Sequence, residues 1–176
     1  MARTVLGETL AGTIFVNADI IAQGLSGFAP ESASVEASRI MLERLRTLAE
    51  RRSDFAFETT LAARTYAAWL QEIRQTGYTL HLFYFWLQHP DVAVSRVALR
   101  VSRGGHAIPE GTIRQRYERS IQNFFQLYRN IVHSWRFYDN SEYEFPRLIA
   151  VKDLESPEQI LDLDTWQQLQ HGLKDA

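Results

Sequence analysis

Two carboxylates lie at or just beyond the ends of short apolar runs that are predicted to be strands. Asp19 comes just after a β-rich run at residues 13–17, and Glu58 directly follows the run at residues 55–57. A carboxylate at the end of a strand can take a proton from a substrate hydroxyl, or bind a sugar hydroxyl or a hydrated magnesium ion. Each also has a structural alternative, because Asp19 can cap the turn that follows it and Glu58 can cap the next helix.

A second group with chemical potential is rich in arginine. Arg96, Arg100 and Arg103 are spaced by four and three residues, which places them on one face of a helix. The glycine pair 104–105 follows as an expected hinge. A second helix then brings further arginines: Arg114, Arg116 and Arg119. Such a hairpin can close over a polyphosphate and neutralise charge that develops during transfer, and the alternative is a solvated amphipathic hairpin.

The elements that must position these groups are readable from hydrophobic periodicity and turn residues. Strands are predicted at residues 13–17, 55–57, 78–87, 135–138 and 148–151, and helices at 30–52, 62–76, 90–104, 109–131 and 156–171. Gly77 is expected to end its helix in the left-handed conformation, and Ser156 to cap the last helix. This alternation predicts an α/β fold, with a mainly parallel sheet and helices on both faces. Ligands of such sheets bind beyond the carboxyl ends of the strands.

Composition excludes several classes of function. A chain of 176 residues with 45% hydrophobic and 23% charged residues indicates a single globular domain, residues 1–176. The absence of cysteine removes disulfides, thiolate metal sites and thiol nucleophiles, and no cluster has metal-ligand spacing, so no metal site is predicted. A net charge of −2 argues against nucleic acid as a partner. With no membrane-spanning run or signal peptide, we expect a cytoplasmic protein.

The basic residues are unevenly divided, with 17 arginines and only 2 lysines. Arginine is the residue of planar, bidentate phosphate recognition. The alternative is codon bias in a GC-rich genome, with most arginines solvated on helix faces.

Several separated motifs, in order, resemble the zeta-toxin family, P-loop kinases of the toxin–antitoxin type and their chromosomal relatives. The motifs are FVNAD at 15–19, IAQGLS at 21–26, FAPESA at 28–33, FETTL at 57–61 and GGHAIP at 104–109, and the similarity covers roughly residues 2–151. The resemblance implies a P-loop kinase-like three-layer sandwich. It also implies transfer of the γ-phosphoryl group of ATP, with Mg²⁺, to a small hydroxylated substrate such as a UDP-N-acetyl amino sugar.

Site roles follow from this resemblance only. Asp19 matches the general base that acts on the substrate hydroxyl, and a lid is implied at about residues 96–120. The other matched positions are Glu58 and Thr60 for the substrate, Arg103, Arg114 and Arg116 for phosphates in the lid, and Asp139 and Asn140 beside the adenine. An antitoxin protein is an implied possible partner, besides the small-molecule substrate.

The sequence departs from the family at its phosphate-binding loop. No Gly-x-x-x-x-Gly-Lys-[Ser/Thr] segment occurs, although its amides, lysine and hydroxyl would hold the phosphates and magnesium. We expect an N-terminal truncation that lacks this loop and the central first strand, with very weak ATP binding. Three interpretations stay open: a kinase recorded from a start codon chosen too late, a truncated relative that binds a substrate or partner without catalysis, or an unrelated α/β binding domain.

Overall fold

The computed structural model describes residues 12–27, 30–105, 107–142 and 145–173. Its contacts divide the chain into two compact units. The first unit contains residues 1–59 and 100–107, and the second contains residues 60–99 and 108–176. Each unit is described by itself below.

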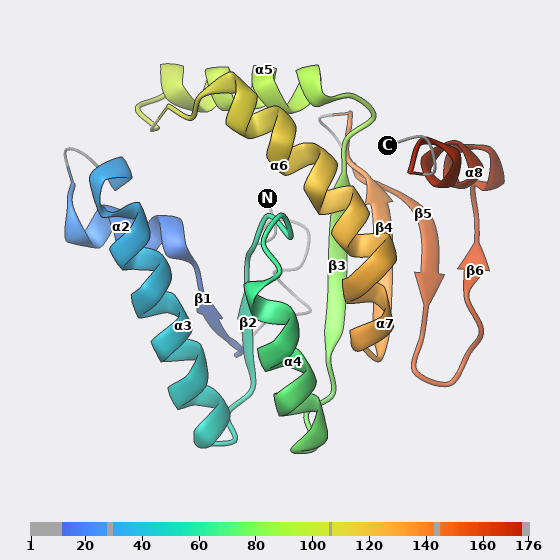
Figure 1. The fold of residues 1–176 in the computed structure, drawn as a ribbon, viewed down its shortest axis with the longest axis horizontal. Coiled ribbons are helices and arrows are strands. Elements are labelled where there is room, and N and C mark those ends of the chain that lie inside the picture. The colour runs from blue at the N-terminus through green and yellow to red at the C-terminus, as the bar shows by residue number, and fades with distance from the viewer. Residues whose placement is uncertain (1–11, 28–29, 106, 143–144, 174–176) are drawn as a thin grey trace. The chain divides into compact units, whose positions relative to one another are not determined.

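The first unit is built around two short parallel strands. Its elements are β1 (Ile14–Val16), α2 (Ala18–Leu25), the 3₁₀ turn η1 (Pro30–Ala33), α3 (Ser34–Glu50) and β2 (Phe55–Phe57) (Figure 1). β1 and β2 pair in parallel, with Val16 opposite Phe57. Both strands therefore end at the same edge, which is where parallel strands present functional residues.

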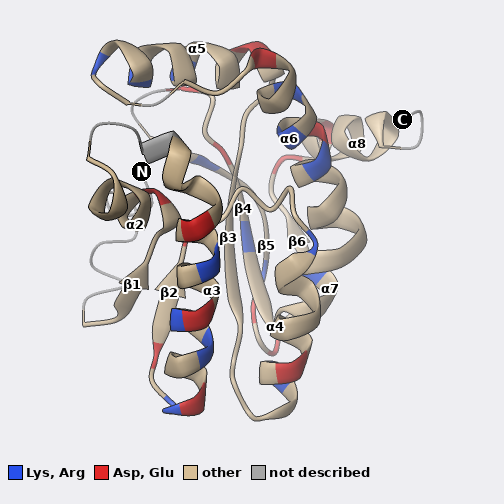
Figure 2. Ribbon diagram, turned by 60° about the vertical axis from the view of Figure 1, so that its left-hand side comes forward, with Lys and Arg blue, Asp and Glu red and all other residues tan. Residues whose placement is uncertain are grey.

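Helix α3 buries one stripe and exposes the rest of its surface. Its buried residues recur at threes and fours: Ala37, Met41, Leu45 and Leu48. Arg39, Arg44 and Arg46 are exposed, and Figure 2 shows basic and acidic positions interleaved along α3. For these arginines the solvated-face interpretation is therefore correct.

The second unit contains a four-stranded sheet with helices. Its elements are α4 (Thr65–Gln75), β3 (His81–Trp86), α5 (Pro90–Ser102), α6 (Glu110–Asn123), the π-helical turn η2 (Phe124–Tyr128), α7 (Arg129–Ile131), β4 (Ser134–Asp139), β5 (Arg147–Lys152), β6 (Gln159–Ile160) and α8 (Leu163–Gly172) (Figure 1). Helix α5 crosses the division between the units at residue 100. The strand order is β3-β4-β5-β6.

The α/β class predicted from the sequence is confirmed, with a refinement in strand direction. β3 and β4 are parallel, whereas β5 and β6 join the sheet antiparallel. The physical reason is the length of the connections. A parallel crossover needs about a dozen residues or more, and the segments at 140–146 and 153–158 are too short to provide one.

Aromatic rings form the core of the second unit. Trp135 and Phe137 are two residues apart on β4, so both face the same side of the sheet, where Phe124 packs edge-on against them at centroid distances of 5.4 and 5.0 Å. Trp166 of α8 stacks on Trp135 at 5.7 Å. All four rings are almost fully buried. This face of the sheet is therefore covered jointly by η2 and α8.

Three boundaries bear directly on the sequence predictions. Gly77 does end α4 with a positive φ of 98°, as predicted. The expectation that Ser156 caps the last helix is wrong: β6 occupies residues 159–160, and α8 begins at Leu163 with Asp162 as its cap. The Asp162 carboxylate accepts the Thr165 N–H at 3.1 Å, which gives the helix a complete cap six residues later than expected.

The helix predicted from residue 109 to 131 is present, but it is interrupted. Near its C-terminal end, between α6 and α7, the chain forms the π-helical turn η2. This turn buries Phe124, Phe125 and Tyr128 together, which suits a segment whose residues must fill an aromatic core. Across all the described ranges, no helix combines the length and the apolar character that a membrane span requires.

Candidate active site

Asn17 and Glu58 meet at the edge where β1 and β2 end. Each residue directly follows its strand, and the parallel register places the two strand ends side by side. The Asn17 Nδ2 donates a hydrogen bond to Glu58 Oε2 at 2.9 Å. The parallel sheet expected from the sequence brings the residues that follow each strand to one edge. For Asn17 and Glu58 that placement is confirmed.

Asn17, rather than Asp19, caps the helix that follows β1. The Asn17 Oδ1 accepts the backbone N–H groups of Asp19 at 2.8 Å and Ile20 at 3.2 Å, which is the geometry of an N-cap. The Asp19 carboxylate is therefore not used for capping and remains exposed in the first turn of α2. Glu58 does not cap a helix either, since α4 begins after Arg64 without a side-chain cap. Neither Asp19 nor Glu58 therefore has the capping role that was its structural alternative.

Arg100 completes a group of four polar side chains in the first unit. Its Nη1 lies 3.9 Å from Asp19 Oδ2. Its other guanidinium nitrogens, Nε and Nη2, are buried and have no hydrogen-bond partner among the described residues. Buried donors are normally paired, so two unpaired ones are where an anion or a hydroxyl could bind. We call Asn17, Asp19, Glu58 and Arg100 the strand-end cluster.

The two glycines after α5 hold Arg100 in place. Gly104 has φ +88°, and its N–H donates to the Val101 carbonyl at 3.0 Å, while the Gly105 N–H donates to the Arg100 carbonyl at 2.9 Å. These two bonds form a Schellman cap. A Cβ on Gly105 would lie 2.7 Å from Arg100 Cγ. The pair predicted as a hinge is thus also a helix terminus that packs directly against the Arg100 side chain.

The three arginines predicted for the lid have different surroundings. Arg103 and Arg116 are exposed. Arg114, in the second unit, donates to Asp91 Oδ1 at 2.5 Å and to Glu110 Oε1 at 2.8 Å, and so joins α5 to α6. This pairing holds the pKa of Asp91 below its usual value. The contact of Arg103, Arg114 and Arg116 with phosphates stays a prediction.

The remaining predicted positions lie in the second unit. Thr60 is exposed. Burial alone would raise the pKa of Asp139, but hydrogen bonds from Ser141, Gln88 and Arg147 outweigh it and lower that pKa. The Asn140 carbonyl accepts Arg96 Nη2 at 2.5 Å. Asp139 therefore stabilises its own turn, and a role beside adenine stays a prediction.

The described residues contain no group of three or more His, Asp or Glu side chains that could hold a metal ion. The unpaired nitrogens of Arg100 suit an anionic or hydroxylated ligand. The residues that would cradle a triphosphate and its magnesium do not occur in this sequence.

Sequence reasoning singled out Asp19 and Glu58 but missed two members of the strand-end cluster. Asn17 could have been recognised, because it directly follows a strand and precedes a helix. Arg100 was placed on the arginine face of its helix, yet nothing local separated it from Arg103. Only the fold shows which of the two faces Asp19.

The strand topology and the strand-end cluster define an α/β protein consistent with a P-loop kinase-like fold. The family model described as Zeta toxin matches residues 26–156, and the chain belongs to the zeta-toxin family. It is also similar to a Haemophilus influenzae (strain ATCC 51907 / DSM 11121 / KW20 / Rd) protein whose description is "Uncharacterized protein". That relative is 25% identical over 104 residues, which cover 59% of this chain and 74% of the relative. No solved structure matches the chain significantly.

Proposed function

We propose that the strand-end cluster binds the phosphate acceptor of a zeta-toxin-type kinase, with Asp19 as the general base. The acceptor is a hydroxyl of a small substrate such as a UDP-N-acetyl amino sugar, and Glu58 and Thr60 help to hold it. The observation that carries this proposal is the Asp19–Arg100 pair beside the linked strand ends. An exposed carboxylate that has no capping role is available to take a proton from a hydroxyl.

Arg100 supports an acceptor that carries oxygen atoms. Two of its buried nitrogens lack partners among the described residues, and charged donors form the stronger hydrogen bonds with hydroxyl and phosphate oxygens. In this proposal Arg100 positions the acceptor and Asp19 acts on its hydroxyl.

The donor side rests on the family alone. ATP with Mg²⁺ is the expected phosphoryl donor, and its phosphates would be contacted by Arg103, Arg114 and Arg116. Asp139 and Asn140 are kept as candidates beside adenine, and a cytoplasmic location and an antitoxin partner belong to the same proposal. The glycine-rich loop that would hold the phosphates of ATP is not among these 176 residues. The second candidate, which the buried Arg100 nitrogens support equally well, is a non-catalytic module that binds a substrate or a partner.

Calorimetry with UDP-N-acetylglucosamine tests the acceptor site. Arg100→Gln should weaken binding about 10-fold or more, because hydrogen bonds to charged groups contribute about 1.5–3 kcal/mol each. The matched control is Arg39→Gln, which removes an exposed arginine of α3. Equal affinities for wild type, Arg100→Gln and the control would refute the acceptor site.

Phosphoryl transfer is tested separately. The 176-residue protein should show no measurable turnover, because losing even one preorganised donor lowers rates by about 10²–10³-fold. A protein extended upstream through an intact loop should gain activity, and Asp19→Asn should abolish most of that gain. The control Glu36→Gln removes an exposed carboxylate from the first turn of α3. Sugar-nucleotide binding without turnover in the extended protein would favour the non-catalytic module.

A further inference from the structure

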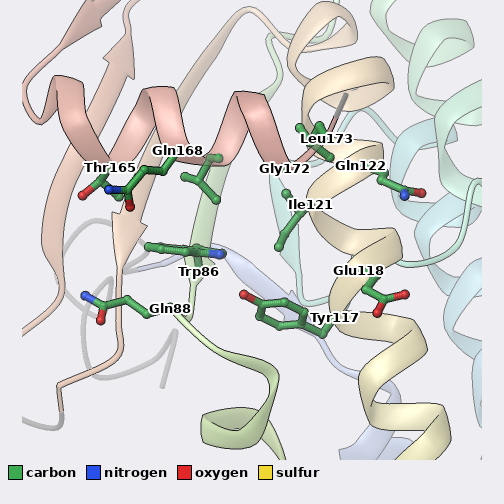
Figure 3. Close-up of a pocket in the computed structure, with 11 residues that line it drawn as sticks. Trp86, Gln88, Tyr117, Glu118, Ile121, Gln122, Thr165, Gln168, Gly172 and Leu173 are labelled. Carbon is green, nitrogen blue, oxygen red and sulfur yellow. The ribbon is translucent and has the colours of Figure 1, made fainter. Parts of the chain in front are cut away.

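A separate cavity of about 590 Å³ lies within the second unit. Its lining comes from the end of β3, from α6 and from α8 (Figure 3). Trp86 lies between Gln88 and Gln168 in this view, and Tyr117 and Ile121 reach toward it from α6. The volume is in the range of small-molecule sites, which is about 300–1,000 Å³.

The lining carries amide groups and a single carboxylate. Gln122 and Gln168 offer both donors and acceptors, as does Gln88, whose Nε2 also donates to Asp139 Oδ2 at 2.8 Å. Among the described residues of the lining, Glu118 is the one Asp or Glu, and there is no Arg, Lys or His. Glu118 is exposed and forms no ion pair in the described part of the chain. Burial raises the pKa of Tyr117, so its phenol stays protonated and donates to the Leu87 carbonyl at 2.8 Å. A phosphate or carboxylate would find no cationic partner among these described residues.

The floor of the cavity is aromatic. Only 7% of the Trp86 surface is exposed, and its ring packs against that of Phe137 with a centroid distance of 6.1 Å. Its Nε1 lies near the Tyr117 phenol but makes no hydrogen bond of acceptable geometry in the described residues. A buried N–H without a good partner at the wall of a cavity is a place where a bound molecule can supply an acceptor.

Gly172 keeps the α8 side of the cavity open. Its φ is not positive, and a Cβ at this position would meet no atom within 4 Å. Neither a positive φ nor close packing therefore requires a glycine at this last residue of α8. A larger side chain at position 172 would occupy the space that the cavity now holds.

We infer that this cavity is a second ligand site, which takes a planar heteroaromatic compound that is uncharged or positively charged. The apolar wall of Trp86, Ile121 and Leu169 contacts the ring, the glutamine amides bind its heteroatoms, and Glu118 selects against anions. This site is independent of the proposed kinase chemistry, because all of its residues lie in the second unit and none belongs to the strand-end cluster.

Tryptamine and indole-3-acetate test this inference, because they share a ring and differ in charge. Each is titrated into the ¹⁵N-labelled chain, and the indole N–H signals of Trp86 and Trp69 are followed. Tryptamine should shift the Trp86 signal while Trp69, which is outside the lining, stays unchanged. Tryptamine should bind about fivefold more tightly than indole-3-acetate, which corresponds to the upper value of about 1 kcal/mol for one exposed ion pair. Glu118→Gln should reduce that preference to about twofold or less.

Gly172→Leu should fill the cavity and weaken tryptamine binding at least 10-fold. Gly111→Leu is the matched control, because Gly111 is also a helical glycine with open space around it and does not line the cavity. The inference is overturned if neither compound shifts Trp86 at millimolar concentration, or if both bind equally to wild type. It is also overturned if Glu118→Gln keeps the full preference, a result that does not depend on whether the leucine variants fold.

Discussion

Replacing Gly105 with alanine should disrupt the end of α5 and move Arg100. A Cβ at this position would lie 2.7 Å from Arg100 Cγ and 2.9 Å from the Arg100 carbonyl oxygen, whereas ordinary contacts begin at 3.4 Å. Relieving both contacts requires shifts of about 0.7 Å (3.4 − 2.7) and about 0.5 Å (3.4 − 2.9). The side chain can move, but the carbonyl is held, because it accepts the Gly105 and Arg103 N–H groups at 2.9 and 3.1 Å.

The expected loss of stability is about 1–3 kcal/mol. Overpacking a well-filled position has about this cost, and each capping hydrogen bond that breaks contributes about 0.5–1.5 kcal/mol. Urea unfolding followed by circular dichroism measures the loss as a lower midpoint. The same variant should weaken binding of UDP-N-acetylglucosamine in the direction of Arg100→Gln, since both changes remove the Arg100 donors from beside Asp19.

Two other glycines serve as controls for this experiment. Gly111→Ala adds a Cβ with nothing within 4 Å and should be neutral or stabilising, because alanine is the better helix former. Gly104→Ala meets no atom but places alanine at φ +88°, which should cost about 1–2 kcal/mol by backbone strain alone. If Gly105→Ala unfolds at the same urea concentration as wild type and binds the sugar nucleotide equally well, the positioning of Arg100 by this glycine is refuted.

Three further changes have defined outcomes. Arg52 follows α3 at φ +56°, so Arg52→Gly should raise the urea midpoint by the equivalent of about 1 kcal/mol; a lower midpoint would contradict the strain. Asn123 is buried and its Oδ1 accepts Arg64 Nε at 3.1 Å, so Asn123→Ala should destabilise by about 2–4 kcal/mol in the same assay. The His133 Nδ1 accepts the Leu80 N–H at 3.0 Å, and burial lowers the pKa of His133. Since the unfolded chain then binds the proton more readily, stability should fall as the pH drops below about 6.5, and His133→Asn should remove that dependence.

The sequence by itself determined most of the strands and helices, although not α2 or β6, and it determined which polar residues follow the first two strands. Apolar runs such as residues 55–57 and periodic stripes such as that of α3 follow from local burial, which a linear pattern records directly. The role of Gly77 could be predicted because a helix often ends in a left-handed residue, and glycine adopts that conformation without strain. The common edge of residues 17 and 58 followed from the rule that parallel strands end together.

Only the tertiary structure decided the outcomes that depend on a distant partner. Asn17 and Asp19 are both good capping residues. Because α2 begins at Ala18, Asn17 is its cap and the Asp19 carboxylate is available for other contacts. Arg100 and Arg103 share a helix face in the sequence, but the packing of Gly105 and the position of Asp19 select Arg100. Ser156 and Pro157 carry a strong local helix-start signal, yet β6 must pair with β5 before the chain can turn into α8. In each case a local preference is worth about 1 kcal/mol, and long-range pairing and burial exceed it.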